Sequence, residues 1–465
     1  MEKTKFVNRV GEINILKDSW KKNTAQFIVI YGRRRIGKTE VIKQFMKEKQ
    51  GIYFLGRLET TKDQLTRISM LLSDFFSDSL LQKSPLASWD AVFEYLYKNN
   101  KKYVIAFDEF PYMVKTSPEI LSIFQDYWDN KLRFSKLFFI VCGSSLSMME
   151  KYIFEYKTPL YGRRTLDLKI APLSFVDAWS FFQNLTIEKA IQAYGVLGGT
   201  PAYLLEFEKD ISSTIEKICM KRSFLFREPE FILREEVSEP RFFFSILHAI
   251  SIGKTRSGDI INHTGLDKGL VGKYLSVLVD LDLIRREIPI TDSWKSRKGN
   301  YYINDEFFRF WFRFIYPNLD VLETNPSDVP KKIKKQLDHY LGETFEMICR
   351  QFLIKTGDVS SMSMGRWWYK DEEIDIVALD EEKKNALFIE CKWQDLSYGE
   401  TRQLLQNLEK KAKMVQWYNE KRNEHYGIIS KNIENKDLLR KEGFIVYDLR
   451  DWMMINKKME RKKEK

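Results

Sequence analysis

Residues 32–39 are GRRRIGKT, in which two glycines, a lysine and a threonine stand at the spacing of a phosphate-binding loop. Gly32 and Gly37 let the backbone turn sharply, so that its N–H groups can point at phosphate oxygens. Lys38 could then reach the β- and γ-phosphates of a nucleotide, and Thr39 could hold Mg²⁺. Other residues of this loop and its helix that we expect to contact the nucleotide are Arg33, Arg34, Arg35, Ile36 and Glu40.

The flanks of this loop match the context that such a loop requires. Residues 27–31, FIVIY, are a short apolar run that predicts a buried parallel strand. Val41, Ile42 and Phe45 follow at helical spacing, so a helix is expected to begin near Lys38 with its positive N-terminus toward phosphate. The alternative is a chance glycine turn before an ordinary helix. Agreement of both flanks with the motif favours nucleotide binding.

Two adjacent carboxylates follow a second buried strand. Residues 103–107 are apolar and are followed directly by Asp108 and Glu109. An apolar strand that ends in two acids is typical of the acidic site that accompanies a phosphate loop. Asp108 would hold the Mg²⁺ shell, and Glu109 would orient or deprotonate the attacking water. The alternative is a helix N-cap, because acidic residues favour that position too.

A third buried strand, residues 137–142, is followed by Gly143 and Ser144. A hydroxyl at that strand end could sense the γ-phosphate, and the alternative is an N-cap for the helix that starts near Leu146.

Arg163 and Arg164 precede the strand expected at residues 166–170. Either arginine could contact the γ-phosphate, in its own chain or from a neighbouring subunit. The alternative is a solvated basic turn.

Five apolar strands alternate with helices over the first third of the chain, which predicts an α/β fold with a doubly wound parallel sheet and the nucleotide at the strand C-termini.

Phe6 and Arg9 precede the first helix and could contact the adenine, although a simple packing staple fits the spacing equally. Pro201 follows two glycines in a helical region. It could lie against the adenine as part of a helical lid, but a helix end followed by a helix start explains it by itself.

Residues 236–317 predict a winged helix-turn-helix, with three helices followed by two short strands. Lys268 and Lys273 would face outward on its third helix and could contact DNA. Nearby aspartates dilute the positive charge. A structural or interdomain role is the alternative.

Near the C-terminus, Asp375 on one expected strand and Glu390-Cys391-Lys392 on the next form a D…E-x-K arrangement. Side chains alternate along a strand, so Glu390 and Lys392 share a face while Cys391 turns into the core. The two acids could hold Mg²⁺ at a scissile phosphate, and Lys392 could activate water. Glu346 from the preceding helix could complete the shell, with Glu343 as the second choice. The alternative is a surface hairpin with alternating charges.

Composition sets broad limits on function. The chain has 465 residues, a net charge of +11 and four scattered cysteines without metal or disulfide spacing. It has no apolar run of membrane length and no signal-peptide segment at its start, so we expect a cytoplasmic, reduced protein with no membrane partner. The positive charge is compatible with nucleic acid but is not specific for it. A homo-oligomer or a protein partner is also compatible with the sequence.

Taken together, these stretches resemble the archaeal-type ATPases of the AAA+/STAND lineage that carry a C-terminal PD-(D/E)xK nuclease-like domain. The matching stretches, in order, are FVNR, YGRRRIGKT, IAFDEF, CGSS, LYGRR, LGGTPAYL, FFRFWFRFIYPN and EIDIVA…IECKW. The resemblance implies ATP and Mg²⁺ at the phosphate loop and its acidic strand, adenine contacts near Phe6–Arg9 and Pro201, and an arginine finger among Arg163 and Arg164. Val10 departs from the acidic residue that relatives often place there. The resemblance does not indicate a substrate for this chain.

We therefore expect an ATPase core at residues 1–172, a helical lid at 173–235, a winged helix at 236–317, a linker at 318–335, a restriction-endonuclease-like α/β domain at 336–456 and a basic tail at 457–465. Two functions fit this organisation. Either ATP hydrolysis controls a DNA-directed metal-dependent nuclease, or ATP acts as a switch for DNA or protein binding while the C-terminal domain is inert.

Overall fold

The computed structural model describes residues 6–99, 101–182 and 184–454. The chain forms two compact units. The first unit comprises Met1–Leu173, Thr200–Ala202 and Phe231–Ser238, and the second comprises Ser174–Gly199, Tyr203–Glu230 and Glu239–Lys465. The continuous part of the first unit ends at Leu173, one residue from the end expected for the ATPase core. Most of the expected lid, the three-helix region and the C-terminal sheet lie together in the second unit, and the finer division among them stays a prediction. The basic tail lies outside the described residues.

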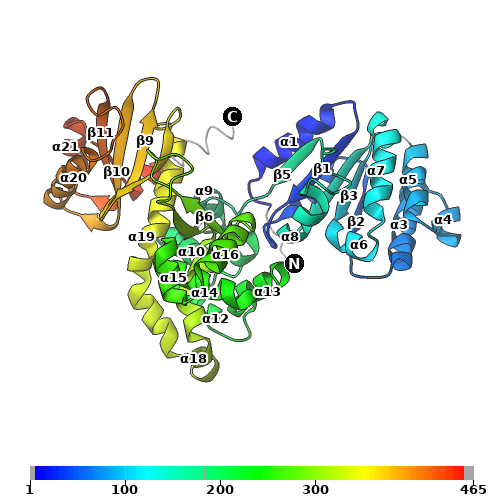
Figure 1. Cartoon of the computed structure of the whole chain (residues 1–465), viewed down its shortest axis with the longest axis horizontal. Coiled ribbons are helices and arrows are strands. Elements are labelled where there is room, and N and C mark those ends of the chain that lie inside the picture. The colour runs from blue at the N-terminus through cyan, green and yellow to red at the C-terminus, as the bar shows by residue number, and fades with distance from the viewer. Residues whose placement is uncertain (1–5, 100, 183, 455–465) are drawn as a thin grey trace. The chain divides into compact units, whose positions relative to one another are not determined.

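The first unit is built on a parallel sheet, which confirms the predicted α/β fold for this part of the chain (Figure 1). Its five strands lie in the order β2-β3-β4-β1-β5. Their bounds are β1 (Gln26–Tyr31), β2 (Gly51–Leu55), β3 (Val104–Asp108), β4 (Phe138–Gly143) and β5 (Leu166–Lys169). Because all neighbouring pairs are parallel, the strands' carboxyl ends share one edge. That edge receives the loops after β1, β3 and β4.

Helices cover both faces of this sheet. Successive apolar side chains of β1 point to opposite faces, so each face needs helices to bury it. Ile28 and Ile30 pack toward α1 (Val10–Lys21) and α2 (Lys38–Met46). Phe27 and Val29 pack toward α3 (Thr61–Phe76), α5 (Trp89–Lys98) and α7 (Ile120–Asn130). The remaining helices of this unit are α4 (Leu80–Lys83), α6 (Phe110–Thr116), α8 (Leu146–Met149), the 3-10 helix Leu132–Phe134 and the π-helix Glu150–Phe154.

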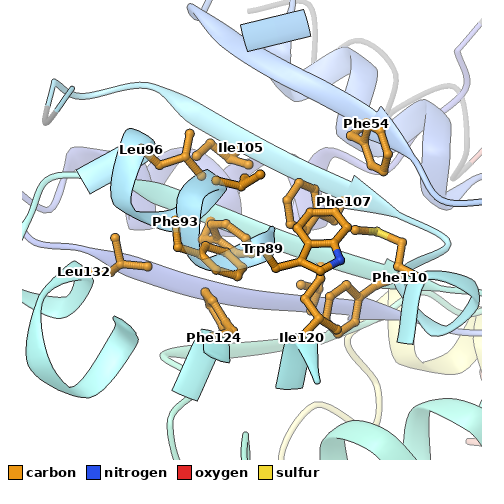
Figure 2. Packing of buried hydrophobic residues seen from close by; sticks show 14 of the residues in the cluster. Phe54, Trp89, Phe93, Leu96, Ile105, Phe107, Phe110, Ile120, Phe124 and Leu132 are labelled. Atoms are coloured by element: carbon orange, nitrogen blue, oxygen red, sulfur yellow. The ribbon is translucent and has the colours of Figure 1, made fainter. Parts of the chain in front are cut away.

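Aromatic rings dominate the core between the sheet and α5 and α7 (Figure 2). Phe93 lies at its centre, with ring centroids 5.3 Å from Phe124, 6.3 Å from Phe139 and 6.4 Å from Trp89. Such tilted ring pairs add to the gain from apolar burial. This core packs against one face of the sheet and holds the strand ends that carry the polar residues at set positions.

The second unit begins with helices and ends in a mixed sheet. Its helices before the sheet are α9 (Phe175–Ala178), α10 (Ile187–Leu197), α12 (Ile211–Ile218), α14 (Pro240–Ser251), α15 (Ser257–Thr264), α16 (Lys268–Asp280), α17 (Glu306–Phe310), α18 (Leu319–Thr324) and α19 (Asp328–Thr356), with 3-10 helices at Trp179–Phe182, Phe224–Phe226 and Tyr316–Asn318. A two-stranded antiparallel sheet, β6 (Ile284–Glu287) and β7 (Asn300–Ile303), follows α16. The aromatic stretch after it continues α17 as the π-helix Trp311–Ile315 and is buried.

Two further helices have residues in both units. Helix α11 (Pro201–Leu204) starts in the first unit, and α13 (Glu228–Glu236) enters it at Phe231.

The linker expected at residues 318–335 is wrong. Helix α19 already begins at Asp328 and runs for 29 residues. Pro330 lies in its first turn, where a missing N–H breaks no helical hydrogen bond. Ile333 and Leu337 are buried four residues apart, so the lysine run around them is the solvent face of a helix.

The C-terminal sheet contains β8 (Ser363–Tyr369), β9 (Glu372–Asp380), β10 (Asn385–Leu396), β11 (Asn423–Ile433) and β12 (Ile445–Asp448), in the order β12-β11-β10-β9-β8. Strands β8, β9 and β10 pair antiparallel, whereas β10, β11 and β12 pair parallel. Helix α20 (Tyr398–Ala412) packs on the face that carries Phe388. Helix α19 packs on the other face, where Phe345 contacts Trp393 at 5.2 Å between ring centroids. Helix α21 (Lys436–Lys441) precedes β12.

Among the residues that the structure describes, no helix is both long and apolar enough to cross a membrane.

We expect Phe93→Ala to lower the free energy of unfolding of the first unit by about 3–5 kcal/mol, because it removes a fully buried ring and leaves a cavity. Hydrogen exchange of the β4 amides in the full chain measures this loss. Phe134→Ala is the control, since Phe134 is 71% exposed and its loss should cost under about 0.5 kcal/mol. Equal effects of the two substitutions would contradict the assignment of this core.

Candidate nucleotide site and C-terminal acidic site

The loop between β1 and α2 has the backbone of a phosphate cradle. Gly32 and Gly37 have φ angles of +144° and +93°, and Arg35 has a φ of +65°. A Cβ on Gly32 would lie 2.3 Å from the carbonyl oxygen of Ile170, so only glycine fits there. Helix α2 begins at Lys38, as predicted. The Lys38 ammonium is buried, donates to the carbonyls of Gly32 and Arg33 at 2.8 Å each, and has its pKa lowered by that burial.

The Arg9 side chain forms a hydrogen bond with the backbone of this loop. Its guanidinium donates to the carbonyl of Ile36 at 3.0 Å and forms an ion pair with Glu12 at 3.0 Å. Arg9 is only 7% exposed, and Phe6 packs against the apolar cluster that contains Ile36. The structure therefore brings Arg9 to the phosphate loop.

The acidic strand meets the helix of the phosphate loop. Asp108 at the end of β3 is buried and accepts hydrogen bonds from the Thr39 hydroxyl at 2.6 Å and from the Tyr53 hydroxyl at 2.6 Å. Burial and the hydrogen bond to Asp108 raise the pKa of Tyr53, so Tyr53 stays a neutral donor. Hydroxyl and carboxylate oxygens are the ligands that Mg²⁺ prefers, so Thr39 and Asp108 fit that ion.

Ser144 holds the second carboxylate. Its hydroxyl donates to one oxygen of Glu109 at 2.5 Å, and its backbone N–H donates to the other at 3.3 Å. Glu109 has a left-handed φ of 52° at the turn from β3 into α6, an unfavourable conformation for a residue other than glycine. Glu109 is the N-cap residue of α6, but its side chain makes no capping hydrogen bond, so the cap alternative does not explain it.

Arg163 and Arg164 form ion pairs with acids outside the phosphate loop. Both precede β5, and the neighbouring Thr165 pairs with Phe27 near the start of β1, whereas the phosphate loop follows its end. Arg163 pairs with Asp129 at 2.7 Å, and Arg164 pairs with Asp167 at 3.3 Å. Parallel pairing of β5 with β1 places their backbone near the start of β1, whereas the Arg164 guanidinium stacks on the Phe154 ring at 4.6 Å. A contact of either arginine with the γ-phosphate stays a prediction.

Pro201 begins helix α11, as the alternative interpretation required. The short segment Thr200–Ala202 nevertheless belongs to the first unit, together with the phosphate loop. Pro201 is half-buried there, and Thr200 is buried.

Two glutamates that the sequence did not single out lie in the first unit beside this site. Glu235 pairs with Arg34 of the phosphate loop at 2.9 Å, and Arg34 also donates to the Tyr112 hydroxyl. Glu236 accepts hydrogen bonds from the backbone N–H groups of Leu146 and Ser147, at 3.2 and 3.0 Å, at the start of α8. Burial raises the pKa of Glu235 although Arg34 opposes that shift. No spacing signal marks an acidic pair inside a charged helix, so only the folded chain reveals it.

The C-terminal acids gather on β9 and β10. Asp375 accepts a hydrogen bond from the backbone N–H of Cys391 at 2.8 Å, and Lys392 donates to Glu390 at 2.7 Å. Glu390 lies on the α20 face, with Lys411 of α20 at 3.9 Å, while Cys391 is buried, so the predicted alternation along this strand is confirmed. Burial and the nearby Asp375 raise the pKa of Glu390. Burial opposes the charge on Lys392, yet Asp375 and Glu390 raise its pKa overall.

A buried carboxylate oxygen of Glu390, Oε2, has no hydrogen-bond partner. The Lys411 ammonium lies 3.9 Å from this oxygen, beyond hydrogen-bond distance. A carboxylate oxygen that makes no hydrogen bond and lies beside a second acid is a position that a divalent cation fits. Within the described residues, however, no group of three or more His, Cys, Asp or Glu side chains is arranged to hold a metal ion.

Glu346, the expected third ligand, pairs with Arg366. Burial and Asp375 raise its pKa. Glu343, the second choice, lies 3.5 Å from Arg309. Both glutamates therefore have arginine partners, and their role as metal ligands stays a prediction.

Arginines balance the charge of this acidic region. Arg350 donates to the backbone carbonyl of Asp375 at 3.1 Å and pairs with Glu287 of β6 at 3.2 Å. Glu287 also lies 4.0 Å from Arg366. The β6–β7 hairpin thus supplies an acid to the C-terminal site, which sequence spacing could not indicate.

Comparison with known proteins supports an ATPase domain in this chain. A family model described as an ATPase domain predominantly from Archaea matches residues 6–207, and a model described as archaeal and bacterial proteins of unknown function matches residues 311–404. An uncharacterized protein of Methanocaldococcus jannaschii is 36% identical over 453 residues, which are 96% of this chain and 100% of that protein. An uncharacterized ATP-binding protein of the same organism is 49% identical over 45 residues, 10% of this chain and 76% of that protein.

Among solved structures, a Walker-type ATPase of Pyrococcus abyssi aligns with a TM-score of 0.51 and 21% identity, covering 66% of this chain and 96% of that one. This similarity shows the fold. The parallel sheet and the phosphate loop define a P-loop ATPase with an ATP-binding domain. The chain carries an ATPase domain of the predominantly archaeal type over residues 6–207 and belongs to the same family as the uncharacterized M. jannaschii relative that it matches over 96% of its length.

We expect Glu235→Gln to tighten ATP binding about two- to fivefold, because it releases Arg34 for phosphate and partly exposed ion pairs are worth about 0.5–1 kcal/mol. Calorimetric titration of the full chain measures the change. The gain should disappear in an Arg34→Ala background. An equal gain in that background would show that Glu235 acts through another group.

Proposed function

We propose that this ATPase is Mg²⁺-dependent and that its nucleotide cycle controls a DNA-directed, metal-dependent nuclease-like region in the second unit. The observation that carries the nuclease half of the proposal is the buried Glu390 oxygen Oε2, which makes no hydrogen bond and has the Lys411 ammonium at 3.9 Å. Glu390 lies on the same strand as Lys392 and near Asp375. The hydrogen bond between Thr39 and Asp108 supports the magnesium site of the ATPase half.

In the ATPase site, the backbone N–H groups of residues 32–39 would bind the phosphates, aided by the N-terminus of α2. Lys38 would move from its two carbonyl acceptors to the β- and γ-phosphates. Thr39 and Asp108 would hold Mg²⁺, which supplies charge neutralisation at the transferring phosphate. Glu109 would orient the attacking water, and Ser144 would fix the carboxylate of Glu109 in position.

Winged-helix architecture is supported by the order of elements between residues 240 and 303. Helices α14, α15 and α16 are followed by the β6–β7 hairpin, and an isolated bridge joins Arg256, before α15, to Asn300. Lys268 and Lys273 are exposed on α16, where a recognition helix would present them. These features support DNA as the partner.

The C-terminal strands support a PD-(D/E)xK assignment. Antiparallel β9 and β10 carry Asp375 and the Glu390–Lys392 pair, and helices pack on both faces of the sheet. Asp375 and Glu390 would hold a divalent cation that stabilises charge on a scissile phosphate. Lys392 would position the attacking water.

The second candidate function is an ATP-controlled switch whose C-terminal region does not cut DNA. Its support is the pairing of Glu346, the expected third ligand, with Arg366. In that case the winged helix binds DNA or protein, and the nucleotide state sets its affinity.

Lys38→Ala should reduce ATP hydrolysis by at least about 100-fold, the loss expected when a group that stabilises developing phosphate charge is removed. Release of inorganic phosphate from the full chain measures the rate. Lys47→Ala, an exposed lysine of the same segment, is the matched control and should hydrolyse ATP normally. Full hydrolysis by Lys38→Ala would refute the site.

Wild type should cut plasmid or branched DNA in Mg²⁺ or Mn²⁺, and Glu390→Gln should lose at least about 100-fold of that rate while it still hydrolyses ATP. Gel analysis of the DNA with and without ATP measures cutting. The control Glu382→Gln changes an exposed acid at the β9–β10 turn and should cut as wild type does. Intact ATP hydrolysis without any cutting by wild type would favour the switch.

A further inference from the structure

A basic and aromatic groove lies within the second unit, where the loop of the β6–β7 hairpin meets strand β8. We infer that this hairpin–strand groove binds single-stranded nucleic acid. Two adjoining pockets form it, with volumes of about 320 Å³ and about 550 Å³. The first is lined by Arg256, Ser257, Arg297, Lys298, Gly299, Asn300, Trp368, Tyr369 and Lys370. The second shares Lys298 and the aromatic residues of β8 with the first and adds Lys413 of the segment after α20.

Positive charge dominates the first pocket. Arg256, Arg297, Lys298 and Lys370 are all exposed there, and none of the nine described residues that line it is acidic. Asp371 and Glu372 follow in the β8–β9 turn but line neither pocket. A cluster of cations in a pocket without an acidic lining residue matches a phosphodiester backbone.

The second pocket includes one acid, Asp292. Its carboxylate lies 3.3 Å from the Lys298 ammonium and accepts a hydrogen bond from the Ser296 hydroxyl at 2.7 Å. Since these hairpin groups partly neutralise Asp292, it opposes an anionic ligand less than a free carboxylate would.

Aromatic faces accompany these cations. Tyr369 is 45% exposed, with the ammonium groups of Lys370 and Lys298 at 5.5 and 5.9 Å from its ring centroid. Trp294, in the same hairpin loop, is 76% exposed but lines neither pocket. Aromatic rings stack on nucleic-acid bases, and base faces are accessible only where the strand is unpaired. The combination therefore favours a single strand over a duplex.

The groove is held by backbone contacts between its two sides. The N–H of Ile290 donates to the carbonyl of Arg366 at 2.8 Å, and the Arg256 guanidinium donates to the carbonyl of Lys370 at 3.3 Å. Ile290 also packs against the apolar core of the C-terminal sheet. The hairpin loop and strand β8 thus present one continuous surface.

The groove leads toward the C-terminal acids. Tyr369 pairs with Glu372 at the start of β9, and Asp375 lies three residues further along that strand, about 10 Å at the rise of an extended chain. A strand bound in the groove could thus pass near Asp375 and Glu390. This part of the inference depends on the proposed nuclease function, whereas binding itself does not.

Fluorescence anisotropy with a labelled oligothymidylate of about 20 nucleotides tests the inference on the full chain. The double variant Arg297→Glu/Lys298→Glu should bind at least tenfold more weakly. Its slope of log affinity against log salt should fall by about 1.4, since each lost phosphate contact contributes about 0.7 for single strands. Tyr369→Ala, which keeps the charge, should bind at least fivefold more weakly with an unchanged slope.

The matched control is Lys332→Glu/Lys335→Glu, two exposed lysines of α19 outside the groove, with the same change in charge. It should bind nearly as wild type does. Equal affinity of the groove variant and this control would overturn the groove while leaving DNA association in place. Tighter binding of duplex than of single strands by wild type would overturn the choice of ligand. No nucleic-acid binding by wild type would overturn both the groove and the DNA-directed function, but not the ATPase.

Discussion

The hydrogen bond between Thr39 and Asp108 is the contact on which the nucleotide site depends. It joins the first turn of α2 to the end of β3, two segments 69 residues apart in sequence. Both groups are placed by the parallel sheet, whose strands end at one edge and whose aromatic core holds them there. Tyr53 at the neighbouring strand donates to the same carboxylate. The acid is therefore fixed by three elements, and its geometry does not depend on a flexible loop.

Much of this site could be predicted from sequence because its information is local. A strand, a glycine loop and a helix follow one another within 20 residues, and the acidic strand ends carry their own apolar signal. Arg163 and Arg164 could not be placed in that way, because their position depends on the register between β5 and β1. The partners Glu235 and Glu236 lie about 90 residues or more beyond the groups they bind, and no periodic pattern marks them.

In the C-terminal region, less of the site could be predicted from sequence. Strand alternation predicted that Glu390 and Lys392 share a face, because a period of two needs no knowledge of neighbours. The pairing of Glu346 with Arg366 could not be predicted, since it arises between α19 and β8.

The prediction of a linker at residues 318–335 was wrong for a simpler reason. Proline and a run of lysines are typical of a loop, yet both are accommodated at the start of a helix whose buried stripe begins with Val329.

The two carbonyl acceptors of Lys38 bear on ligand selectivity. An ammonium buried in a protein keeps its charge only with acceptors around it, and the loop supplies two neutral ones from Gly32 and Arg33. A competing ligand gains by displacing them only if it offers stronger acceptors, which means oxygens with full negative charge. A nucleoside has none, so the loop discriminates in favour of polyanions through its own lysine before any base or sugar is recognised.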